Sequence, residues 1–328
     1  MSRLLDADRD YEGAMGLLVD GRWQDRWYRT DKSGGRFQRR PSTFREELGS
    51  QRFPVESGRY ALIVSYACPW AHRTLIYRAL FGLEAHLPLH VVEPLMLEKG
   101  WTFGEPLWGA DCLHQLYTRA NPTFTGRVTV PVLWDTQTGT IVNNESSELI
   151  RMFSAFDGLG GNTLDFRPEA LVPAIDAINE RVYSDVNNGV YKCGFASTQS
   201  AYDAAVHALF EALDWLEAIL AEQPFLAGDR VTEADWRLLT TLLRFDEVYV
   251  THFKCDRRRI VDYSNLWAYT RQLLQVPGVA ETFRLDHIRS HYFQSHRAIN
   301  PHGIISIGPQ LDWEAPHGRG PVLETART

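Results

Sequence analysis

At 328 residues, with 44% apolar and 23% charged residues, the chain has the length and composition of a globular protein of two domains. Its net charge of -7 at pH 7 argues against a nucleic-acid partner, because such binding depends on basic residues that displace counterions. No stretch approaches the roughly 18 apolar residues of a membrane span, and the first residues do not resemble a signal peptide, so we expect a cytoplasmic protein without membrane contact.

Residues 1–50 are rich in charge, Gly and Trp and show no sustained hydrophobic period, so we expect an irregular N-terminal extension. The pattern changes at about residue 51. The run "YALIV" (60–64) predicts a strand, "CPWAHRTLIYRALFGL" (68–83) has helical spacing, and "LPLHVVEP" (87–94) predicts a second strand. Together these segments form a β-α-β unit.

A segment with several Gly, Trp and Pro residues follows, and we expect it to be an insertion at about 94–120. After it, "RVTVPVLWDTQTGTIVNNESSELIRMF" (127–153) predicts two strands around a turn at "TQTG", and then a helix that begins in the polar cluster 143–147. A β-α-β half followed by a β-β-α half is the layout of a thioredoxin-like domain, which we place at 51–157.

Helical patterns replace the strands further along, so we expect an all-helical domain at 165–298 and a C-terminal tail at 299–328. In "YDAAVHALFEALDWLEAILAEQ" (202–223), one helix face carries apolar residues at Ala205, Leu209, Leu213, Leu216 and Leu220. The spacing of Thr232 and Asp235 predicts a capping box at the start of the next helix. The predicted fold class is therefore α/β followed by all-α.

Cys68 stands between the first strand and the first helix. Backbone N–H groups and the positive end of the helix dipole favour a thiolate at such a position, and Pro69 suits the first helical residue. The alternative is a small buried core residue, since free cysteines are often buried. Ala71 stands where a dithiol oxidoreductase keeps its second cysteine, so a second thiol has to come from another molecule.

The other cysteines are scattered singly, without the spacing of a zinc site or the density of a disulfide scaffold: Cys112, Cys193 and Cys255. We interpret them as packing residues in a protein of a reducing compartment. His287 and His291 have the spacing of half a metal site, but no third ligand is visible nearby, so we expect no bound metal.

Two further segments are compatible with a peptide-like ligand. If the Val130–Pro131 bond is cis, the Val130 main chain would be available to pair with a ligand; the alternative is an ordinary edge-strand proline. Glu145 and Ser146 stand at a predicted helix N-terminus that could hold a carboxylate, and Glu145 could meet an ammonium group. The alternative there is simple helix capping.

Several sequence blocks together resemble the glutathionyl-hydroquinone reductases, the xi class of glutathione transferases. The blocks run from the N-terminal extension to about residue 310: "CPWAHRTLI", "GWTF", "NPTFTGRVTVPVLWD", "NNESSELIRMF", "NNGVYKCGFA", "FLAGDRVTEADWRL", "FDEVYVTHFKC" and "HYFQSH". The resemblance implies a thioredoxin-like first half, a helical second half and a homodimer.

The resemblance also implies roles for individual residues. Cys68 would be the nucleophile and Tyr191 the proton donor, while Tyr249 and Tyr292 would border the aromatic substrate and, if their hydroxyls point at the sulfur, stabilise the thiolate. Glutathione would be held by Trp101, Arg127, Val128, Thr129, Val130, Glu145 and Ser146. Without the resemblance, each tyrosine reads as a packed helical residue.

The implied activity is glutathione-dependent reduction of glutathionyl-hydroquinones through a mixed disulfide between Cys68 and glutathione. One alternative is an omega-like thiol transferase or dehydroascorbate reductase, which shares the cysteine but does not need the "GWTF" segment or the "HYFQSH" block. Another is a non-catalytic, transferase-like interaction module in which Cys68 has an ordinary pKa.

Overall fold

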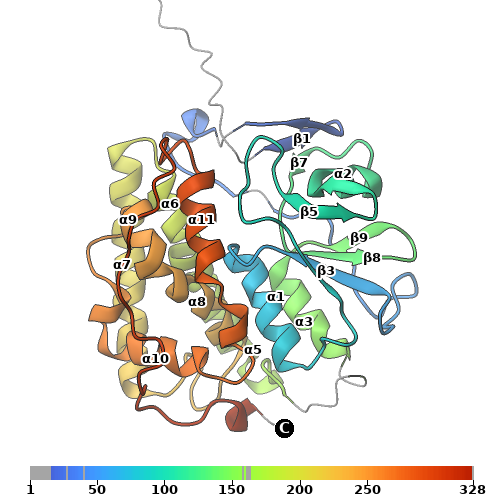
Figure 1. Cartoon of the computed structure of the whole chain (residues 1–328). Helices are drawn as coiled ribbons and strands as arrows, with labels where there is room; N and C mark the ends of the chain where they lie inside the picture. Colours follow the sequence, from blue (N-terminus) through green and yellow to red (C-terminus); the bar gives the residue numbers. More distant parts are fainter. Residues whose placement is uncertain (1–15, 27–28, 40, 157–158, 160–163, 327–328) are drawn as a thin grey trace, which may run out of the picture.

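The computed structural model describes residues 16–26, 29–39, 41–156, 159 and 164–326. Figure 1 shows two halves side by side. One half contains the strands together with a few helices, and the other half is helical. Residues 1–15 of the predicted extension and the predicted domain end at residue 157 lie outside the described residues.

The central sheet has four strands in the order β4-β3-β8-β9. Their bounds are Tyr60–Val64 for β3, Leu89–Val91 for β4, Val132–Asp135 for β8 and Thr140–Asn143 for β9. β3 runs parallel to β4 and antiparallel to β8, and β8 runs antiparallel to β9. Helix α1 (Pro69–Leu80) connects the parallel pair and α3 (Ser146–Met152) follows β9, so the predicted thioredoxin-like order is confirmed.

The N-terminal extension is not wholly irregular, contrary to the prediction. β1 (Leu17–Val19) and β2 (Arg22–Gln24) form an antiparallel pair, and β1 also pairs with β7 (Gly126–Arg127). Strands of three residues carry no readable period, and the second partner of β1 lies more than 100 residues away in the chain. This pairing attaches the extension to the segment that leads into Val130.

The predicted insertion contains regular structure as well. β5 (Thr102–Leu107) and β6 (Ala110–Cys112) form a hairpin, and α2 (Leu113–Ala120) follows and packs against β9. The Gln115 carboxamide oxygen accepts from the Cys112 N–H at 2.9 Å and so caps this helix. With only two turns, α2 was too short to show a helical period in the sequence.

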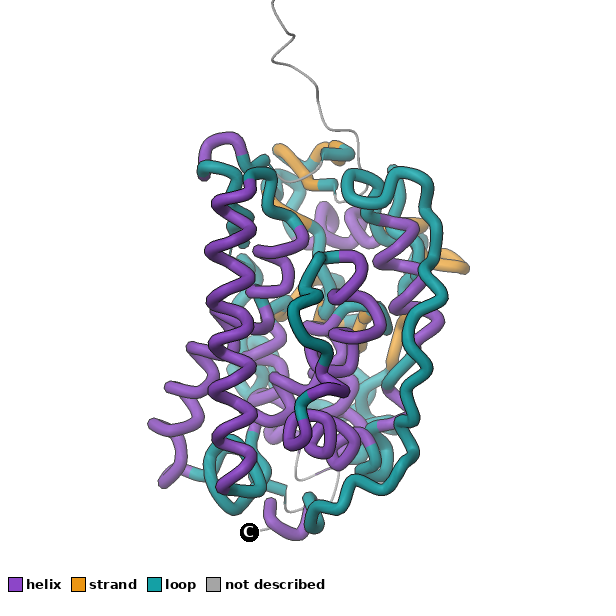
Figure 2. The backbone as a smooth tube through the Cα atoms, turned by 90° about the vertical axis from the view of Figure 1, so that its left-hand side faces the viewer, coloured by secondary structure: helices purple, strands orange, loops and turns teal. Residues whose placement is uncertain are grey.

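The second half is helical in the described residues. Its helices are α5 (Val172–Arg181), α6 (Gly189–Gly194), α7 (Gln199–Glu222), α8 (Glu233–Arg244), α9 (Val250–His252), α10 (Ser264–Leu274) and α11 (Leu285–Ser295). In Figure 2 these helices face the viewer and the strands lie behind them. The predicted apolar face of α7 is buried, and the capping box at Thr232 and Asp235 is present, so both predictions are confirmed.

Two π-helical turns interrupt this half, at Val182–Asn187 before α6 and at Phe245–Tyr249 between α8 and α9. Such turns often occur at functional sites, because one extra residue in a turn reorients the side chains that follow. Here the first precedes α6, which carries Tyr191, and the second ends at Tyr249.

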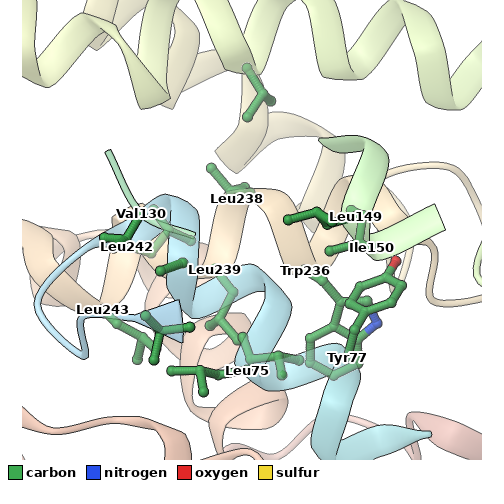
Figure 3. Close-up of a cluster of buried hydrophobic side chains, with 14 of the residues drawn as sticks. Leu75, Tyr77, Val130, Leu149, Ile150, Trp236, Leu238, Leu239, Leu242 and Leu243 are labelled. Carbon is green, nitrogen blue, oxygen red and sulfur yellow. The ribbon is translucent and has the colours of Figure 1, made fainter. Parts of the chain in front are cut away.

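The two halves meet along an apolar interface, shown in Figure 3. Side chains of α1 and α3 pack there with side chains of α8, and all of them are buried: Leu75, Tyr77, Leu149, Ile150, Trp236, Leu238, Leu239, Leu242 and Leu243. Burial of one such side chain contributes about 1.5–3 kcal/mol, so this interface is large enough to fix the position of one half against the other.

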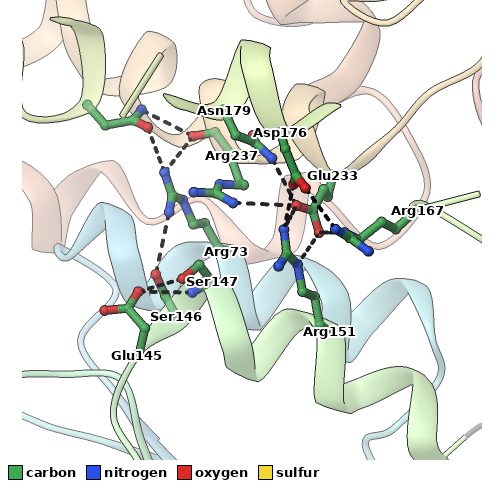
Figure 4. Close-up of polar contacts among 11 residues, drawn as sticks. Arg73, Glu145, Ser146, Ser147, Arg151, Arg167, Asp176, Asn179, Glu233 and Arg237 are labelled. Carbon is green, nitrogen blue, oxygen red and sulfur yellow. Dashed lines mark hydrogen bonds and ion pairs between the residues drawn. The ribbon is translucent and has the colours of Figure 1, made fainter. Parts of the chain in front are cut away.

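An ion cluster around the buried Glu233, beside that interface, links α3 to α8 (Figure 4). The Glu233 carboxylate on α8 accepts from the Arg151 guanidinium on α3 at 2.6 and 2.9 Å, and from the Asn179 amide at 2.9 Å. The Glu233 side chain is 2% exposed but that of Arg151 is 39% exposed, so solvent screens the pair and it contributes less than a fully buried pair would. The cluster therefore holds α3, whose first residues belong to the candidate site, against the helical half.

The tail after residue 298 runs along the helical half as a loop (Figure 2), as far as a short 3₁₀ turn at Leu323–Ala326. Arg319 fastens it by donating to the Gln272 side chain at 2.8 Å. Within the described residues, no helix has the length and apolarity needed to cross a membrane.

Candidate active site

Cys68 lies at the junction of β3 and α1, as predicted. Its N–H donates to the Ser65 carbonyl at 3.1 Å, its carbonyl accepts the first helical bond from His72, and Pro69 is the first residue of the helix. The side chain is half-buried, and its thiol donates to the Val130 carbonyl at 3.5 Å. The helix start therefore presents the sulfur towards the segment between β7 and β8.

Burial raises the pKa of Cys68 above its usual value. The N–H groups of Ala71 and Trp70 lower it, as do the charges of Arg244 and Arg39, but they do not outweigh burial. The net direction is therefore opposite to the one expected from the helix start alone.

Arg244 at the end of α8 holds the loop that precedes Cys68. It is fully buried, and its guanidinium donates to the Ala67 carbonyl at 2.9 Å, to the Tyr66 carbonyl at 2.9 Å and to His72 Nδ1 at 3.0 Å. The helical half thus fixes the backbone that leads into the cysteine and one side chain in the first turn after it, and it brings a cation near the sulfur. No pattern in the sequence indicated this role for Arg244.

The protonation state of His72 follows from its partners. The Thr282 hydroxyl donates to the Val279 carbonyl at 2.6 Å, so it accepts from His72 Nε2–H at 2.8 Å. His72 Nδ1 is then an acceptor for Arg244, which requires a neutral ring. Burial and the charge of Arg244 lower the pKa of His72 well below its usual value, in agreement with this assignment.

Cys68 faces a cavity of about 680 Å³, measured with the space open to solvent and called here the cysteine cavity. Aromatic residues from both halves and from the extension line it: Trp23, Trp70, Trp101, Tyr191 and Tyr292. The predicted residues Arg127, Val128, Thr129 and Val130 also line it, whereas Tyr249, Glu145 and Ser146 do not. An aromatic-walled cavity with a few polar groups suits a flat organic ring.

Three tyrosine hydroxyls meet at the wall of this cavity. The Tyr292 hydroxyl lies 2.6 Å from the Tyr191 hydroxyl and 2.9 Å from the Tyr249 hydroxyl, so the three form a chain with Tyr292 in the middle. The resemblance gave Tyr249 and Tyr292 a role at the sulfur only if their hydroxyls point at it; in the described structure the two hydroxyls bond to each other and, through Tyr292, to Tyr191, and the sulfur bonds to Val130. These two hydroxyls act on Tyr191 instead.

The pKa values of all three tyrosines are raised, and that of Tyr191 is raised least. Burial, together with the nearby Cys68, raises the pKa of Tyr191 to about 12, while Arg39 and the hydroxyls of Tyr292 and Tyr249 lower it. Burial raises the pKa values of Tyr249 and Tyr292 well above the usual value. Tyr191 is therefore protonated at neutral pH, and the tyrosinate left after proton donation would be stabilised by its neighbour.

The segment proposed for peptide binding lies beside the sulfur. The Val130–Pro131 peptide bond is cis, the condition that the sequence argument set for this segment. The Tyr117 hydroxyl donates to the Thr129 carbonyl at 2.7 Å and the Arg127 guanidinium to the Arg26 carbonyl at 2.7 Å, so both ends of the segment are anchored. Trp101 stacks on the His291 ring with a centroid separation of 4.8 Å.

Glu145 caps α3, which is the alternative that the sequence left open. Its carboxylate accepts from the N–H of Ser147 at 3.1 Å and from the hydroxyl of Ser42, in the extension, at 3.1 Å. The buried Ser146 hydroxyl accepts from Arg73 at 3.5 Å. Burial lowers the pKa of Arg73 to about 9.

Glu145 borders a second hollow of about 790 Å³, which we call the polar hollow. Charged groups from the extension, α3, α5 and α8 line it: Arg39, Arg45, Glu145, Asp176, Glu180 and Arg237. Arg39 lines both the polar hollow and the cysteine cavity, so the two adjoin at this residue. Together they offer an aromatic part and a zwitterion-compatible part to one extended ligand.

Seven residues that line the cysteine cavity were not among the predicted site residues: Gly16, Trp23, Arg39, Trp70, Met96, His291 and His296. Trp23 and Arg39 belong to the extension, which carries no period to indicate contact with a site elsewhere in the chain. Trp70 lies two residues after the cysteine, and its position in the first turn of α1 could have identified it.

Burial lowers the pKa of His252 to about 3 and that of His291 to about 4, and lowers the pKa of His296 well below its usual value. These three histidines are therefore neutral. No group of three His, Cys, Asp or Glu side chains in the described ranges is arranged to hold a metal ion.

Two family models match this chain. Residues 67–155 match the N-terminal domain of glutathione S-transferase, and residues 199–272 match the C-terminal domain of glutathione S-transferase. The first range contains Cys68 and the predicted peptide-binding residues, and the second contains Tyr249.

Curated relatives match over almost the whole chain. The chain is 55% identical to the glutathionyl-hydroquinone reductase YqjG of Escherichia coli, covering 93% of this chain and 98% of the relative. It is 51% identical to the glutathionyl-hydroquinone reductase PcpF of Sphingobium chlorophenolicum, covering 90% of this chain and 96% of the relative.

Solved structures also match over almost the whole chain. The glutathione-bound structure of YqjG superposes with a TM-score of 0.84 at 52% identity, covering 93% of this chain and 99% of the other. A xi-class glutathione transferase from Natrialba magadii superposes with a TM-score of 0.86 at 45% identity, covering 94% and 98%.

Proposed function

The chain belongs to the glutathionyl-hydroquinone reductases, the xi class of glutathione transferases, and from this premise we propose that it reduces glutathionyl-hydroquinones to hydroquinones. Glutathione is the co-substrate, and oxidised glutathione is the second product. The observation that carries the proposal is the cysteine cavity, which brings a single nucleophilic sulfur and a protonated tyrosine together between aromatic walls.

In the first step the Cys68 thiolate attacks the sulfur of the glutathionyl group. A sulfur–sulfur bond forms, the bond from sulfur to the ring carbon breaks, and its electron pair passes to the ring. Tyr191 supplies the proton that the ring carbon gains, which releases the hydroquinone. The raised pKa of Tyr191 supports this role, because it keeps the proton available at neutral pH.

In the second step the thiolate of a second glutathione attacks the mixed disulfide on Cys68. Oxidised glutathione leaves and the Cys68 thiolate is restored, while Tyr191 regains its proton from solvent. Ala71 supports this order, because the position where a local second thiol would stand holds a methyl group instead.

We assign glutathione binding to the main chain of Val128–Val130 and the side chains of Trp101 and Arg127, with Glu145 and Ser146 at the far end. The anchored backbone beside the sulfur and the adjoining polar hollow support this placement. Tyr292 and Tyr249 support the acid: each adds one hydroxyl to the chain that ends at Tyr191.

Mass spectrometry of the intact protein after exposure to glutathionyl-menadiol tests this function. One glutathione should attach, and peptide mapping should place it on Cys68 and not on the buried Cys112, Cys193 or Cys255. Under turnover, glutathionyl-menadiol and glutathionyl-benzohydroquinone should be reduced faster than dehydroascorbate. Faster reduction of dehydroascorbate would favour the omega-like alternative, and the absence of any adduct would favour the interaction module.

We also propose that the protein acts in the cytoplasm as a homodimer. The four described cysteines are all free, which suits a reducing compartment, and dimerisation is expected from the family. Sedimentation equilibrium measures the oligomeric state, and a monomer at all protein concentrations would contradict the dimer.

A further inference from the structure

Arg39 brings a positive charge from the N-terminal extension to the reaction centre. Its side chain is half-buried and borders both the cysteine cavity and the polar hollow. Its Nε donates to the Asn188 side-chain oxygen at 2.8 Å, and Asn188 lies three residues before Tyr191. The guanidinium is thus oriented by the segment that carries the proposed acid.

Three aromatic rings surround this guanidinium. Its central carbon lies 4.9 Å from the centroid of the Trp70 ring, 5.1 Å from that of Tyr191 and 5.6 Å from that of Phe37. Rings at these distances hold a guanidinium by cation–π attraction without neutralising its charge. Arg39 is therefore held in place at the cavity wall as a cation.

No acidic side chain among the described residues forms an ion pair with Arg39, although many other arginines in the chain have such a partner. Among the described residues, the lining of the cysteine cavity includes Arg39 and Arg127 and no Asp or Glu. The polar hollow on the other side of Arg39 has acidic residues, but none of them forms an ion pair with it. Removing a charge from water is costly unless an opposite charge compensates it. A rigid cation without a carboxylate partner, at the wall of a cavity without acids, indicates an anionic group in the ligand.

We propose that Arg39 binds an oxygen of the hydroquinone ring and stabilises the negative charge that develops there as the carbon–sulfur bond breaks. This assignment rests on the proposed function. It makes Arg39 a catalytic residue contributed by the extension, in addition to Cys68 and Tyr191.

The charge balance of the reaction explains why such a group is needed. When Tyr191 places its proton on the ring carbon that carries sulfur, the adjacent hydroxyl gives its own proton to solvent and its oxygen becomes a carbonyl. The Cys68 thiolate then takes the sulfur, and the electron pair of the broken carbon–sulfur bond passes through the ring to that oxygen. The oxygen becomes a phenolate of the released hydroquinone and regains a proton from solvent. A fixed guanidinium at that oxygen lowers the barrier, because charge appears there in the transition state.

The electrostatics favour the ring over the carboxylates of glutathione as the partner of Arg39. The charge of Arg39 lowers the pKa of Cys68 and that of Tyr191, so it acts on both reacting groups. A guanidinium placed to bind only a peptide carboxylate in the polar hollow would not need to stack on the Tyr191 ring. The carboxylate is the competing assignment that the experiment must separate.

The test uses Arg39→Met, which removes the charge and keeps similar bulk, and Arg39→Lys, which keeps the charge. Arg52→Met is the matched control, because Arg52 also stacks on an aromatic ring, that of Phe53 at 4.9 Å, but lines neither cavity. Single-turnover cleavage of glutathionyl-menadiol by excess enzyme, without free glutathione, measures the first step. For the second step, the mixed disulfide on Cys68 is first formed with oxidised glutathione. Glutathione is then added, and the rate at which oxidised glutathione is released is measured.

For Arg39→Met we expect the first step to slow on the order of 10²-fold, with a smaller loss for Arg39→Lys and none for Arg52→Met. The second step and the KM for glutathione should be unchanged. The pH midpoint for alkylation of Cys68 by iodoacetamide should rise in Arg39→Met, because a charge that lowers this pKa is gone, and should stay in place in Arg39→Lys. If Arg39 had only a structural role, Arg39→Met and Arg39→Lys would have the same pH midpoint for alkylation of Cys68.

An equal loss in both steps with a raised KM for glutathione would assign Arg39 to the peptide carboxylate and overturn the proposal. An unchanged first step in Arg39→Met would also overturn it. If circular dichroism shows that Arg39→Met does not fold, Arg39→Lys decides. A lysine keeps the charge but cannot contact both Asn188 and the ring oxygen, so the first step should slow while the pH midpoint for Cys68 stays in place. An unchanged first step in Arg39→Lys would then overturn the proposal. Failure of the wild-type enzyme to cleave glutathionyl-menadiol would instead refute the proposed function.

Discussion

Replacement of Cys68 by serine should abolish the reduction of glutathionyl-hydroquinones, with a loss of at least ~10³-fold in kcat. A serine hydroxyl ionises far less readily than a thiol, and it cannot form the disulfide that carries glutathione between the two steps. With glutathione bound but no sulfur to receive it, the variant could show weak conjugation of glutathione to quinones. Both activities are measured by chromatography of the hydroquinone and conjugate products.

Cys193→Ser is the matched control for that variant. Cys193 is buried, lies two residues from Tyr191 and does not line the cysteine cavity. It should retain reductase activity and still acquire one glutathione on Cys68. Full reductase turnover in Cys68→Ser would refute the assignment of the nucleophile.

The pH dependence of the wild-type enzyme follows from two shifted pKa values. Because the pKa of Cys68 is raised, the reactive thiolate becomes more abundant as pH rises through that pKa, so kcat/KM should rise over the same range. Because the pKa of Tyr191 is raised to about 12, this acid does not lose its proton over the ordinary alkaline range. The profile should therefore show a rising limb without a falling limb from Tyr191.

The fold could be predicted from the sequence wherever the hydrophobic period of a helix or strand was long enough to be recognised. The strand Tyr60–Val64, helix α1 and the buried face of α7 all extend over at least five residues with one pattern, and all three were predicted. The pairs β1–β2 and β5–β6 were not predicted, because strands this short or irregular depend on partners rather than on their own pattern.

The site was predictable in part, since local position identified Cys68 but not its environment. The helix start was readable, whereas the burial that raises the pKa of Cys68 depends on side chains from both halves. Arg244 lies 177 residues from Ala67, the residue whose carbonyl it holds, and Tyr191 lies 101 residues from Tyr292. A single sequence contains no signal for such pairings, and only the family resemblance brought the tyrosines into consideration.

Tyr191→Phe should slow the first step by about 10²- to 10⁴-fold, the usual contribution of a positioned general acid. The phenyl ring of residue 191 stays, so packing against the substrate is preserved. Its hydroxyl is lost, so the carbon of the hydroquinone ring has no proton donor. Release of glutathione from the mixed disulfide needs no proton on carbon, so the second step should be unaffected. Single-turnover cleavage of glutathionyl-menadiol, followed by release with glutathione, separates the two steps.

The hydroxyl chain predicts a graded series behind Tyr191. Tyr292→Phe removes the hydroxyl 2.6 Å from Tyr191 and so raises the pKa of Tyr191, whereas Tyr249→Phe removes only the more distant member of the chain. First-step rates should therefore fall most in Tyr191→Phe, less in Tyr292→Phe and least in Tyr249→Phe. Tyr202→Phe is the control, because its hydroxyl bonds to the Lys254 carbonyl away from the cavity. If Tyr292→Phe instead raised the pH midpoint for alkylation of Cys68 while leaving the proton-dependent step intact, the tyrosines would act on the sulfur, and the hydroxyl chain would have no role in proton donation.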